Sequence, residues 1–128
     1  MAKKKKILAV DDDDAICAIY EEGIPLMGFD VHCAISASKA KEYLKKELPD
    51  AILMDIMMEE QDGISLTQEI HANPRTSHIP ILIVSGLSDA ATLNDAILFG
   101  AVDYVVKPID FEVIKSKLDR IFELKKKK

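Results

Sequence analysis

The sequence lacks several features that would assign it at once to a broad class of protein. No apolar run approaches the length of a membrane-spanning helix, and only four apolar residues follow the lysines at 3–6, which argues against a signal peptide. Only two cysteines are present, Cys17 and Cys33, and their spacing is not that of a CxxC motif. We therefore expect two buried free thiols in a protein of the reducing cytoplasm.

Basic residues are scarce away from the two ends of the chain. Eight of the 17 lysines and arginines lie in the runs 3–6 and 125–128, which we expect to be solvated, and the nine others face 22 acidic residues. This balance of −13 would repel a nucleic-acid backbone, so we expect no direct nucleic-acid partner. With 128 residues, 48% of them hydrophobic, the chain is expected to form one domain over residues 1–128.

Apolar runs of strand length alternate with amphipathic runs of helix length. Five such pairs in strict alternation predict a flavodoxin-like, doubly wound α/β fold, in which helices cover both faces of a parallel five-stranded sheet. The second strand alternates apolar and polar residues, which favours an edge position and the strand order 2-1-3-4-5. The expected strands are 7–10, 29–34, 51–54, 79–85 and 102–106, and the expected helices are 15–27, 38–47, 63–72, 88–99 and 111–124.

Four consecutive aspartates, Asp11 to Asp14, follow the first expected strand. Carboxylates crowded at one edge of a sheet repel one another unless a cation neutralises them, and a hard divalent metal such as Mg2+ takes oxygen ligands. A solvated loop, with Asp14 as the N-cap of the first helix and Asp13 in solvent, explains the same residues without a metal.

Polar residues also follow the other strands. Asp55 comes directly after the third strand, Ser85 ends the fourth, and Lys107 follows the fifth. In a doubly wound sheet the ligand site lies outside the carboxyl ends of the strands, so these residues and the aspartates should converge there. Each residue alone has a simpler explanation as a cap, a turn former or a surface lysine, but their coincidence at every strand end favours a site.

These residues carry a resemblance to a known family. The segments ILAVDDDD, AILMDIMMEEQDGISL, IPILIVSGLSD and GAVDYVVKP have the order and spacing of a response-regulator receiver domain, which the chain resembles over nearly its whole length. The resemblance implies a cytoplasmic phosphoacceptor of a two-component phosphorelay. In such a phosphorelay a histidine kinase or a phosphotransfer protein phosphorylates Asp55, with Mg2+, or Mn2+ as the alternative ion, as cofactor.

The resemblance implies a metal site with four contributors. Asp12 would ligate the ion directly and Asp11 through water, while Asp55 and the backbone carbonyl of Met57 would supply further oxygen ligands. Asp13 and Asp14 match no ligand position of the family.

The resemblance also implies a catalytic charge and a switch. Lys107 would place a positive charge on the phosphoryl group, and Ser85 would donate a hydrogen bond to it. A cis peptide bond between Lys107 and Pro108 would direct the ammonium. Movement of Ser85, followed by Tyr104, would change a protein-binding surface on the fourth helix, fifth strand and fifth helix, where a downstream protein binds.

Other positions depart from the commonest pattern of the family. Glu59 stands where many receivers have proline, which predicts a more acidic and more mobile loop that Mg2+ could draw in. Val102 replaces a common acidic residue, and 89–99 contains no basic residue, which argues against a charge-paired dimer. The resemblance would place Met57 and Leu87 beside the path of water to phosphorus, and neither can orient a water molecule. We therefore expect a long-lived phosphorylated state.

The residues that follow each strand separate a receiver domain from the alternative functions. A metal-dependent phosphatase with an aspartate nucleophile places it after the first strand in a DxD arrangement, whereas Asp55 follows the third. A flavodoxin shares the topology, but four aspartates in its first loop would repel the flavin phosphate. A receiver excised from a larger regulator or hybrid kinase stays open. The expected protein is a signalling domain that catalyses only its own phosphoryl transfer and slow autodephosphorylation.

Overall fold

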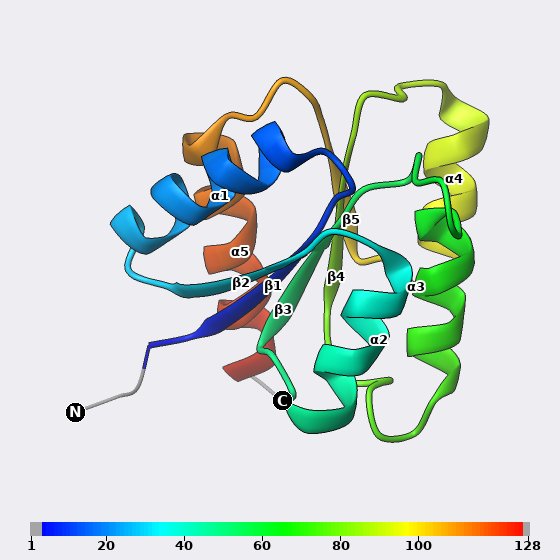
Figure 1. The fold of residues 1–128 in the computed structure, drawn as a ribbon, viewed down its shortest axis with the longest axis horizontal. Helices are drawn as coiled ribbons and strands as arrows, with labels where there is room; N and C mark the ends of the chain where they lie inside the picture. Colours follow the sequence, from blue (N-terminus) through cyan, green and yellow to red (C-terminus); the bar gives the residue numbers. More distant parts are fainter. Residues whose placement is uncertain (1–3, 127–128) are drawn as a thin grey trace.

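In the computed structural model, which describes residues 4–126, five parallel strands form one sheet between two layers of helices (Figure 1). The strand order β2-β1-β3-β4-β5 confirms the predicted doubly wound fold. The strands are β1 Lys6–Val10, β2 Asp30–Ala34, β3 Ala51–Met54, β4 Ile81–Ser85 and β5 Asp103–Val106. The helices are α1 Asp14–Leu26, α2 Ala37–Lys46, α3 Gly63–Ala72, α4 Ala90–Leu98 and α5 Phe111–Lys126.

Burial along each strand explains its place in the sheet. Every residue of β3 and β4, and all of β1 except Lys6, is buried, since helices cover both faces of these central strands. β2 and β5 each contain exposed residues and lie at the two edges, as the alternating pattern of 29–34 predicted for β2. None of the helices within residues 4–126 has the length and apolarity needed to cross a membrane.

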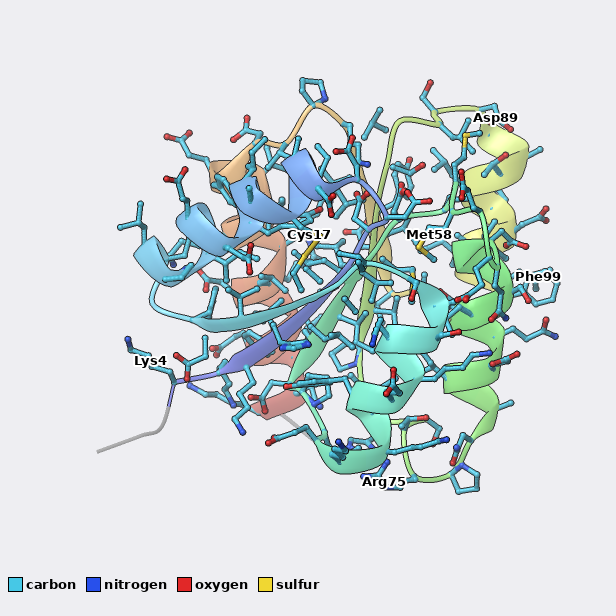
Figure 2. All side chains as sticks on the ribbon, in the orientation of Figure 1. Lys4, Cys17, Met58, Arg75, Asp89 and Phe99 are labelled. Atoms are coloured by element: carbon cyan, nitrogen blue, oxygen red, sulfur yellow. A yellow bond between two sulfur atoms is a disulfide. The ribbon has the colours of Figure 1, made fainter. Side chains whose placement is uncertain are left out.

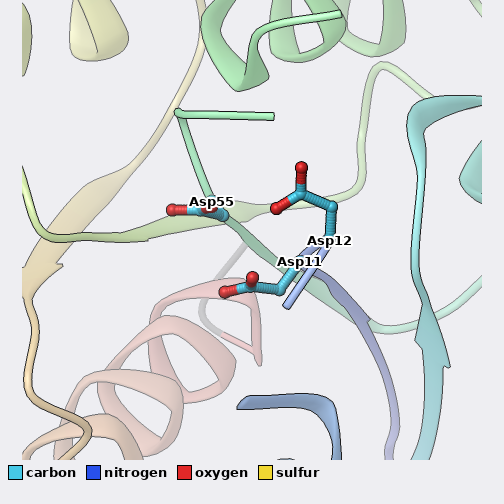
Figure 3. Close-up of side chains that lie close together, drawn as sticks. All are labelled: Asp11, Asp12 and Asp55. Atoms are coloured by element: carbon cyan, nitrogen blue, oxygen red, sulfur yellow. The ribbon is translucent and has the colours of Figure 1, made fainter. Parts of the chain in front are cut away.

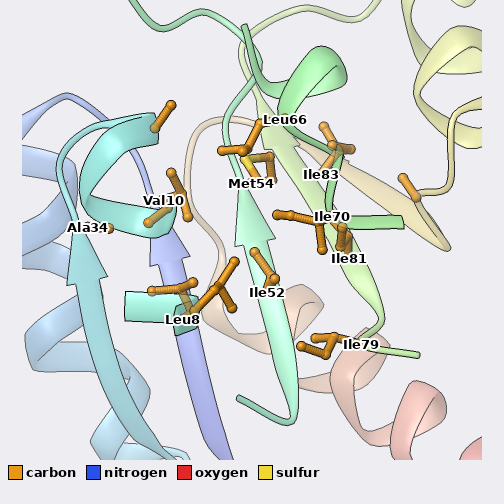
Figure 4. Packing of buried hydrophobic residues seen from close by; sticks show 14 of the residues in the cluster. Leu8, Val10, Ala34, Ile52, Met54, Leu66, Ile70, Ile79, Ile81 and Ile83 are labelled. Carbon is orange, nitrogen blue, oxygen red and sulfur yellow. The ribbon is translucent and has the colours of Figure 1, made fainter. Parts of the chain in front are cut away.

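Two hydrophobic cores lie on opposite faces of the sheet. Leu8 and Val10 of β1 point into the core beneath α2, α3 and α4, part of which Figure 4 shows, whereas Ile7 and Ala9 point into the core beneath α1 and α5. This alternation follows from the two-residue period of a strand. Full burial of one such aliphatic side chain stabilises a fold by about 1.5–3 kcal/mol, so the two cores stabilise the sheet from both faces.

The start of α1 differs from the sequence-based prediction. Asp13, not Asp14, is the N-cap: its backbone is extended, and its side chain accepts hydrogen bonds from the amides of Ala15 and Ile16. Asp14 is the first helical residue, where its charge suits the positive helix end. The prediction that Asp14 is the N-cap was therefore wrong, whereas Asp13 is exposed as predicted and also caps the helix.

The two cysteines are bonded to each other, so the prediction of free thiols was wrong. Cys17 of α1 and Cys33 of β2 form a disulfide, visible beside the Cys17 label in Figure 2, with their Cα atoms 5.9 Å apart. That separation lies within the usual range for a disulfide. The packing of α1 along β2 brings the two residues together, and their spacing in the sequence does not reveal it.

The described lysines of the two end runs are exposed, as expected. Lys6 is the first residue of β1, and its exposed side chain forms an ion pair with Glu47 at 2.9 Å. Lys125 and Lys126 are the last residues of α5. The remaining terminal lysines, at 3, 127 and 128, lie outside the described residues.

Gly63, the first residue of α3, permits a close contact between this helix and the end of β3. Its amide donates to the carbonyl of Ile56 at 2.8 Å, and a Cβ atom at Gly63 would overlap the carbonyl oxygen of Asp55. A backbone atom cannot move aside as the end of a flexible side chain can. The absence of a side chain at Gly63 therefore sets how closely α3 approaches Asp55.

Gly63→Ala should destabilise the protein by about 1–3 kcal/mol, because α3 must shift to relieve the overlap with Asp55. Chemical denaturation measures the free energy of unfolding. Gly86→Ala is the matched control, since a Cβ atom there meets nothing within 4 Å. Equal stability of the two variants would contradict this account of the contact.

Candidate functional site

Main-chain hydrogen bonds continue the sheet by one residue beyond three of its strands. The amide of Asp11 donates to the last carbonyl of β2 at 3.1 Å, and that of Asp55 donates to the last carbonyl of β1 at 3.0 Å. The amide of Lys107 donates to the last carbonyl of β4 at 2.7 Å. Each of these residues therefore has a backbone position fixed by the sheet.

Three carboxylates meet at this edge (Figure 3). Asp11, Asp12 and Asp55 each contribute an oxygen atom, and these atoms lie within 4.8 Å of one another. Asp11 is 1% exposed and Asp55 is 6% exposed, whereas Asp12 is open to solvent. Two buried carboxylates and one exposed carboxylate form a cup of oxygen atoms of the kind that hard divalent cations prefer.

Lys107 reaches the two buried carboxylates. Its Nζ atom lies 2.8 Å from Oδ2 of Asp11 and 3.4 Å from Oδ1 of Asp55. The peptide bond between Lys107 and Pro108 is cis, as predicted. One ammonium therefore serves two carboxylates and cannot neutralise both.

The electrostatics of the cluster follow from this shortage of positive charge. Burial, and then the charge of Asp11, raise the pKa of the Asp55 carboxyl, although Lys107 opposes both effects. Burial alone would lower the pKa of Lys107, but its hydrogen bond to Asp11 and the charges of both aspartates raise it overall. The ammonium therefore stays charged, and a divalent cation bound here would relieve repulsion that Lys107 leaves uncompensated.

Two backbone amides hold the carboxylates of Asp11 and Asp12 in place. Oδ1 of Asp11 accepts a hydrogen bond from the amide of Asp13 at 3.0 Å. Oδ2 of Asp12 accepts one from the amide of Glu59, 47 residues away, at 3.1 Å. The first contact is a local turn that an aspartate run favours, but the second depends on where the β3–α3 loop lies.

The other predicted site residues differ in how deeply they are buried. Ser85 is 1% exposed, and its Oγ atom accepts a hydrogen bond from the amide of Leu87 at 3.2 Å. Leu87 packs against the core beneath α2, α3 and α4, whereas Met57 is 67% exposed. Tyr104, on edge strand β5, is 36% exposed. Ser85 and Leu87 are therefore packed in place, while Met57 and Tyr104 have room to move.

Comparison with known proteins identifies the class to which this fold and edge cluster belong. Residues 7–119 match the response regulator receiver domain family. The chain belongs to this family, and it is thus a signalling domain of two-component signal transduction.

Individual relatives are consistent with this membership. The transcriptional regulatory protein ZraR of Escherichia coli is 37% identical over 115 residues, which cover 89% of this chain and 25% of ZraR. A signal receiver domain of a signal transduction histidine kinase from Syntrophus aciditrophicus is 25% identical, with a TM-score of 0.84 and coverage of 93% of this chain and 90% of that chain. A CheY-like response regulator receiver domain protein from Methanospirillum hungatei, 23% identical, supports the fold alone, with a TM-score of 0.87 over 98% of this chain and 100% of that one.

Asp55→Asn should raise the melting temperature of the metal-free protein near neutral pH. The pKa of Asp55 is raised by folding, so ionisation of this carboxyl costs stability at pH values above the raised pKa, and the cost vanishes below the ordinary pKa of 3.8. The advantage of Asp55→Asn over the wild type should therefore shrink as the pH falls toward that value.

Thermal melts in the presence of a chelator, at a series of pH values, measure this difference. Asp95→Asn is the control, because Asp95 is exposed within α4 and lies outside the cluster. A lower melting temperature of Asp55→Asn at neutral pH would show that the ion pair with Lys107 outweighs burial and repulsion.

Proposed function

We propose that Asp55 is the phosphoacceptor of this receiver domain and that residues 1–128 form the domain. The observation that carries the proposal is the cluster itself. One carboxylate oxygen from each of Asp11, Asp12 and Asp55 lies within 4.8 Å of the others, and Lys107 contacts the two buried carboxylates. The partner is a histidine kinase or phosphotransfer protein that carries a phosphorylated histidine.

In the proposed reaction a carboxylate oxygen of Asp55 attacks the phosphorus in line with the leaving group. An O–P bond forms, the P–N bond to the donor imidazole breaks, and the nitrogen keeps the electron pair and then takes a proton. Such transfers depend mainly on positioning and on charge stabilisation. The sheet fixes the backbone of Asp55, and Lys107 lies 3.4 Å from its Oδ1, where it can hold the phosphoryl oxygens.

The proposed cofactor is Mg2+, with Mn2+ as the alternative ion. The residues that would hold it are Asp11, Asp12, Asp55 and the backbone carbonyl of Met57, and an all-oxygen set of this kind suits either ion. When bound, the ion supplies positive charge that offsets the carboxylates and the phosphoryl oxygens. The uncompensated repulsion between Asp11 and Asp55 supports this assignment.

Ser85 and Tyr104 are the proposed switch. The Oγ atom of Ser85 already accepts from the amide of Leu87, so its own hydrogen is available for a phosphoryl oxygen. Movement of Ser85 toward that group would open space for Tyr104, which is one-third exposed on β5.

The proposed output surface lies on α4, β5 and α5, next to this switch. Exposed apolar side chains on or between these elements give it the character of a protein-binding face rather than of a nucleic-acid site. They include Ile97, Leu98, Val102, Tyr104, Val106 and Val113. α4 contains no basic residue, which argues against charge pairing across this face in a dimer.

The chain spans about a quarter of the length of ZraR, one of the curated relatives that it matches, so a receiver that belongs to a larger regulator or hybrid kinase stays a candidate. A phosphatase is not favoured, because Asp55 follows β3 and not β1. The proposed kinase partner places the domain in the cytoplasm. The bond between Cys17 and Cys33 is the observation that argues against a fully reducing compartment.

Incubation with an acyl phosphate and Mg2+ should add a single phosphoryl group, and intact-mass measurement detects it. Asp55→Asn should show no adduct, because the nucleophilic oxygen is lost. Asp12→Ala should lose metal-dependent labelling, whereas Asp14→Ala, which changes an aspartate outside the cluster, should label as wild type does. An undiminished adduct in Asp55→Asn would overturn the assignment.

The phosphorylated state should be long-lived, because Met57 and Leu87 cannot orient an attacking water molecule. Met57→Asn and Leu87→Glu should each speed loss of the phosphoryl group by about threefold or more, since a polar side chain can hold water near phosphorus. Decay of the phosphorylated mass over time measures the rate.

Met57→Asn is the cleaner of the two variants, because Met57 is 67% exposed and packs little. Leu87→Glu needs a melting curve beside it, since Leu87 contacts the core. Decay as slow as wild type in both variants would show that these positions do not control access of water.

A further inference from the structure

The loop between β3 and α3 is tied to the rest of the molecule at two consecutive residues. The amide of Glu59 donates to Asp12, as described above. The carboxylate of the next residue, Glu60, accepts two hydrogen bonds from Ser38 of α2: from its amide at 2.7 Å and from its hydroxyl at 2.8 Å. The loop is thus linked both to the acidic cluster and to a helix that contributes nothing to that cluster.

Ser38 lies in the first turn of α2, where backbone amides have no partner within the helix. The N-cap of α2, Ser36, serves only the amide of Lys39, at 3.1 Å, and the first turn contains no acidic residue. Glu60 therefore provides the negative charge that this positively polarised helix end lacks, from 22 residues away. Both contacts are charge-assisted, and one of them uses a backbone donor that the helix holds in a fixed direction.

The stretch held by these contacts includes a proposed metal ligand. Met57, whose carbonyl is that ligand, precedes Glu60 by three residues, and Met58 between them packs against the core beneath α2, α3 and α4. A backbone carbonyl can serve as a ligand only in a narrow range of loop conformations. A segment that is already held in place loses less conformational entropy when its carbonyl takes up that position.

We propose that Glu60 is a positioning residue for the metal site: by binding Ser38 at the start of α2, it holds residues 57–60 so that the Met57 carbonyl faces the carboxylates. This inference rests on the proposed function and adds a residue to it. Glu60 touches neither the cation nor the phosphoryl group. The same contact links occupancy of the site to the N-terminal end of α2.

The test is the Mg2+ affinity of the full chain, measured by calorimetry. Glu60→Ala removes both hydrogen bonds and should weaken Mg2+ binding about tenfold, whereas Ser38→Ala removes only the hydroxyl and should weaken it about threefold. Glu60→Gln keeps an oxygen acceptor for the Ser38 amide and should lie between wild type and Glu60→Ala. In the absence of metal, the amides of residues 57–60 should exchange hydrogen faster in Glu60→Ala than in wild type.

Ser38→Ala separates positioning from charge, because it leaves the formal charge unchanged. Glu42→Gln is the control for charge on α2, since Glu42 is exposed and pairs only with Lys39 at 3.5 Å; it should bind Mg2+ as wild type does. Weaker binding in Glu60→Ala with wild-type binding in Ser38→Ala would assign the effect to charge and overturn the proposal. Lower melting temperatures with unchanged Mg2+ affinity would make the contact a helix cap only and would also overturn the proposal.

The wild-type protein distinguishes failure of this inference from failure of the proposed function. If wild type binds Mg2+ and forms the Asp55 adduct while the variants bind Mg2+ equally well, only the role of Glu60 is refuted. If wild type binds no Mg2+ and forms no adduct, the metal site itself is refuted and the positioning role with it.

Discussion

Lys107 divides one positive charge between two carboxylates that are almost completely buried, and much of the site depends on this shortage. Its ammonium lies closer to Asp11 than to Asp55, at 2.8 Å against 3.4 Å, so Asp55 is the less compensated of the pair. Burial of ionised groups without full pairing is costly. Lys107 alone therefore leaves repulsion between the carboxylates uncompensated. A divalent ion bound at the cluster would relieve this repulsion without any rearrangement of the fold.

The sheet makes this unfavourable arrangement tolerable. Asp11 and Asp55 each donate a backbone hydrogen bond to the last carbonyl of a neighbouring strand, so neither can move away from the other without breaking the ladder. Gly63 adds a second restraint, because α3 lies against the carbonyl of Asp55 with no room for a side chain. The burial of β1, β3 and β4 on both faces provides stability that offsets the cost of burying these carboxylates.

The order of the elements could be predicted because the central strands are continuous apolar runs and the helices have clear amphipathic periods. The residues at the carboxyl edge followed from topology, since parallel strands bring their ends together. Element boundaries were less predictable: strand 79–85 begins only at Ile81, and Asp13 rather than Asp14 caps α1, since caps depend on backbone angles. Contacts made by packing had no sequence signal, as the bond between Cys17 and Cys33 shows.

The β3–α3 loop explains how a local charge can affect distant elements. The backbone amide of Glu59 donates to Asp12, and a proline at this position could not make that contact. The sequence had suggested a more mobile loop here. The amide of Glu59 attaches this loop to Asp12, and the carboxylate of Glu60 attaches it to α2; a proline at 59 would remove the first of these contacts. A change in charge at Asp12 therefore acts on the same backbone that α2 holds through Ser38. Because α2 packs on the core shared with α3 and α4, the loop joins the acidic cluster to the helical layer on one face of the sheet.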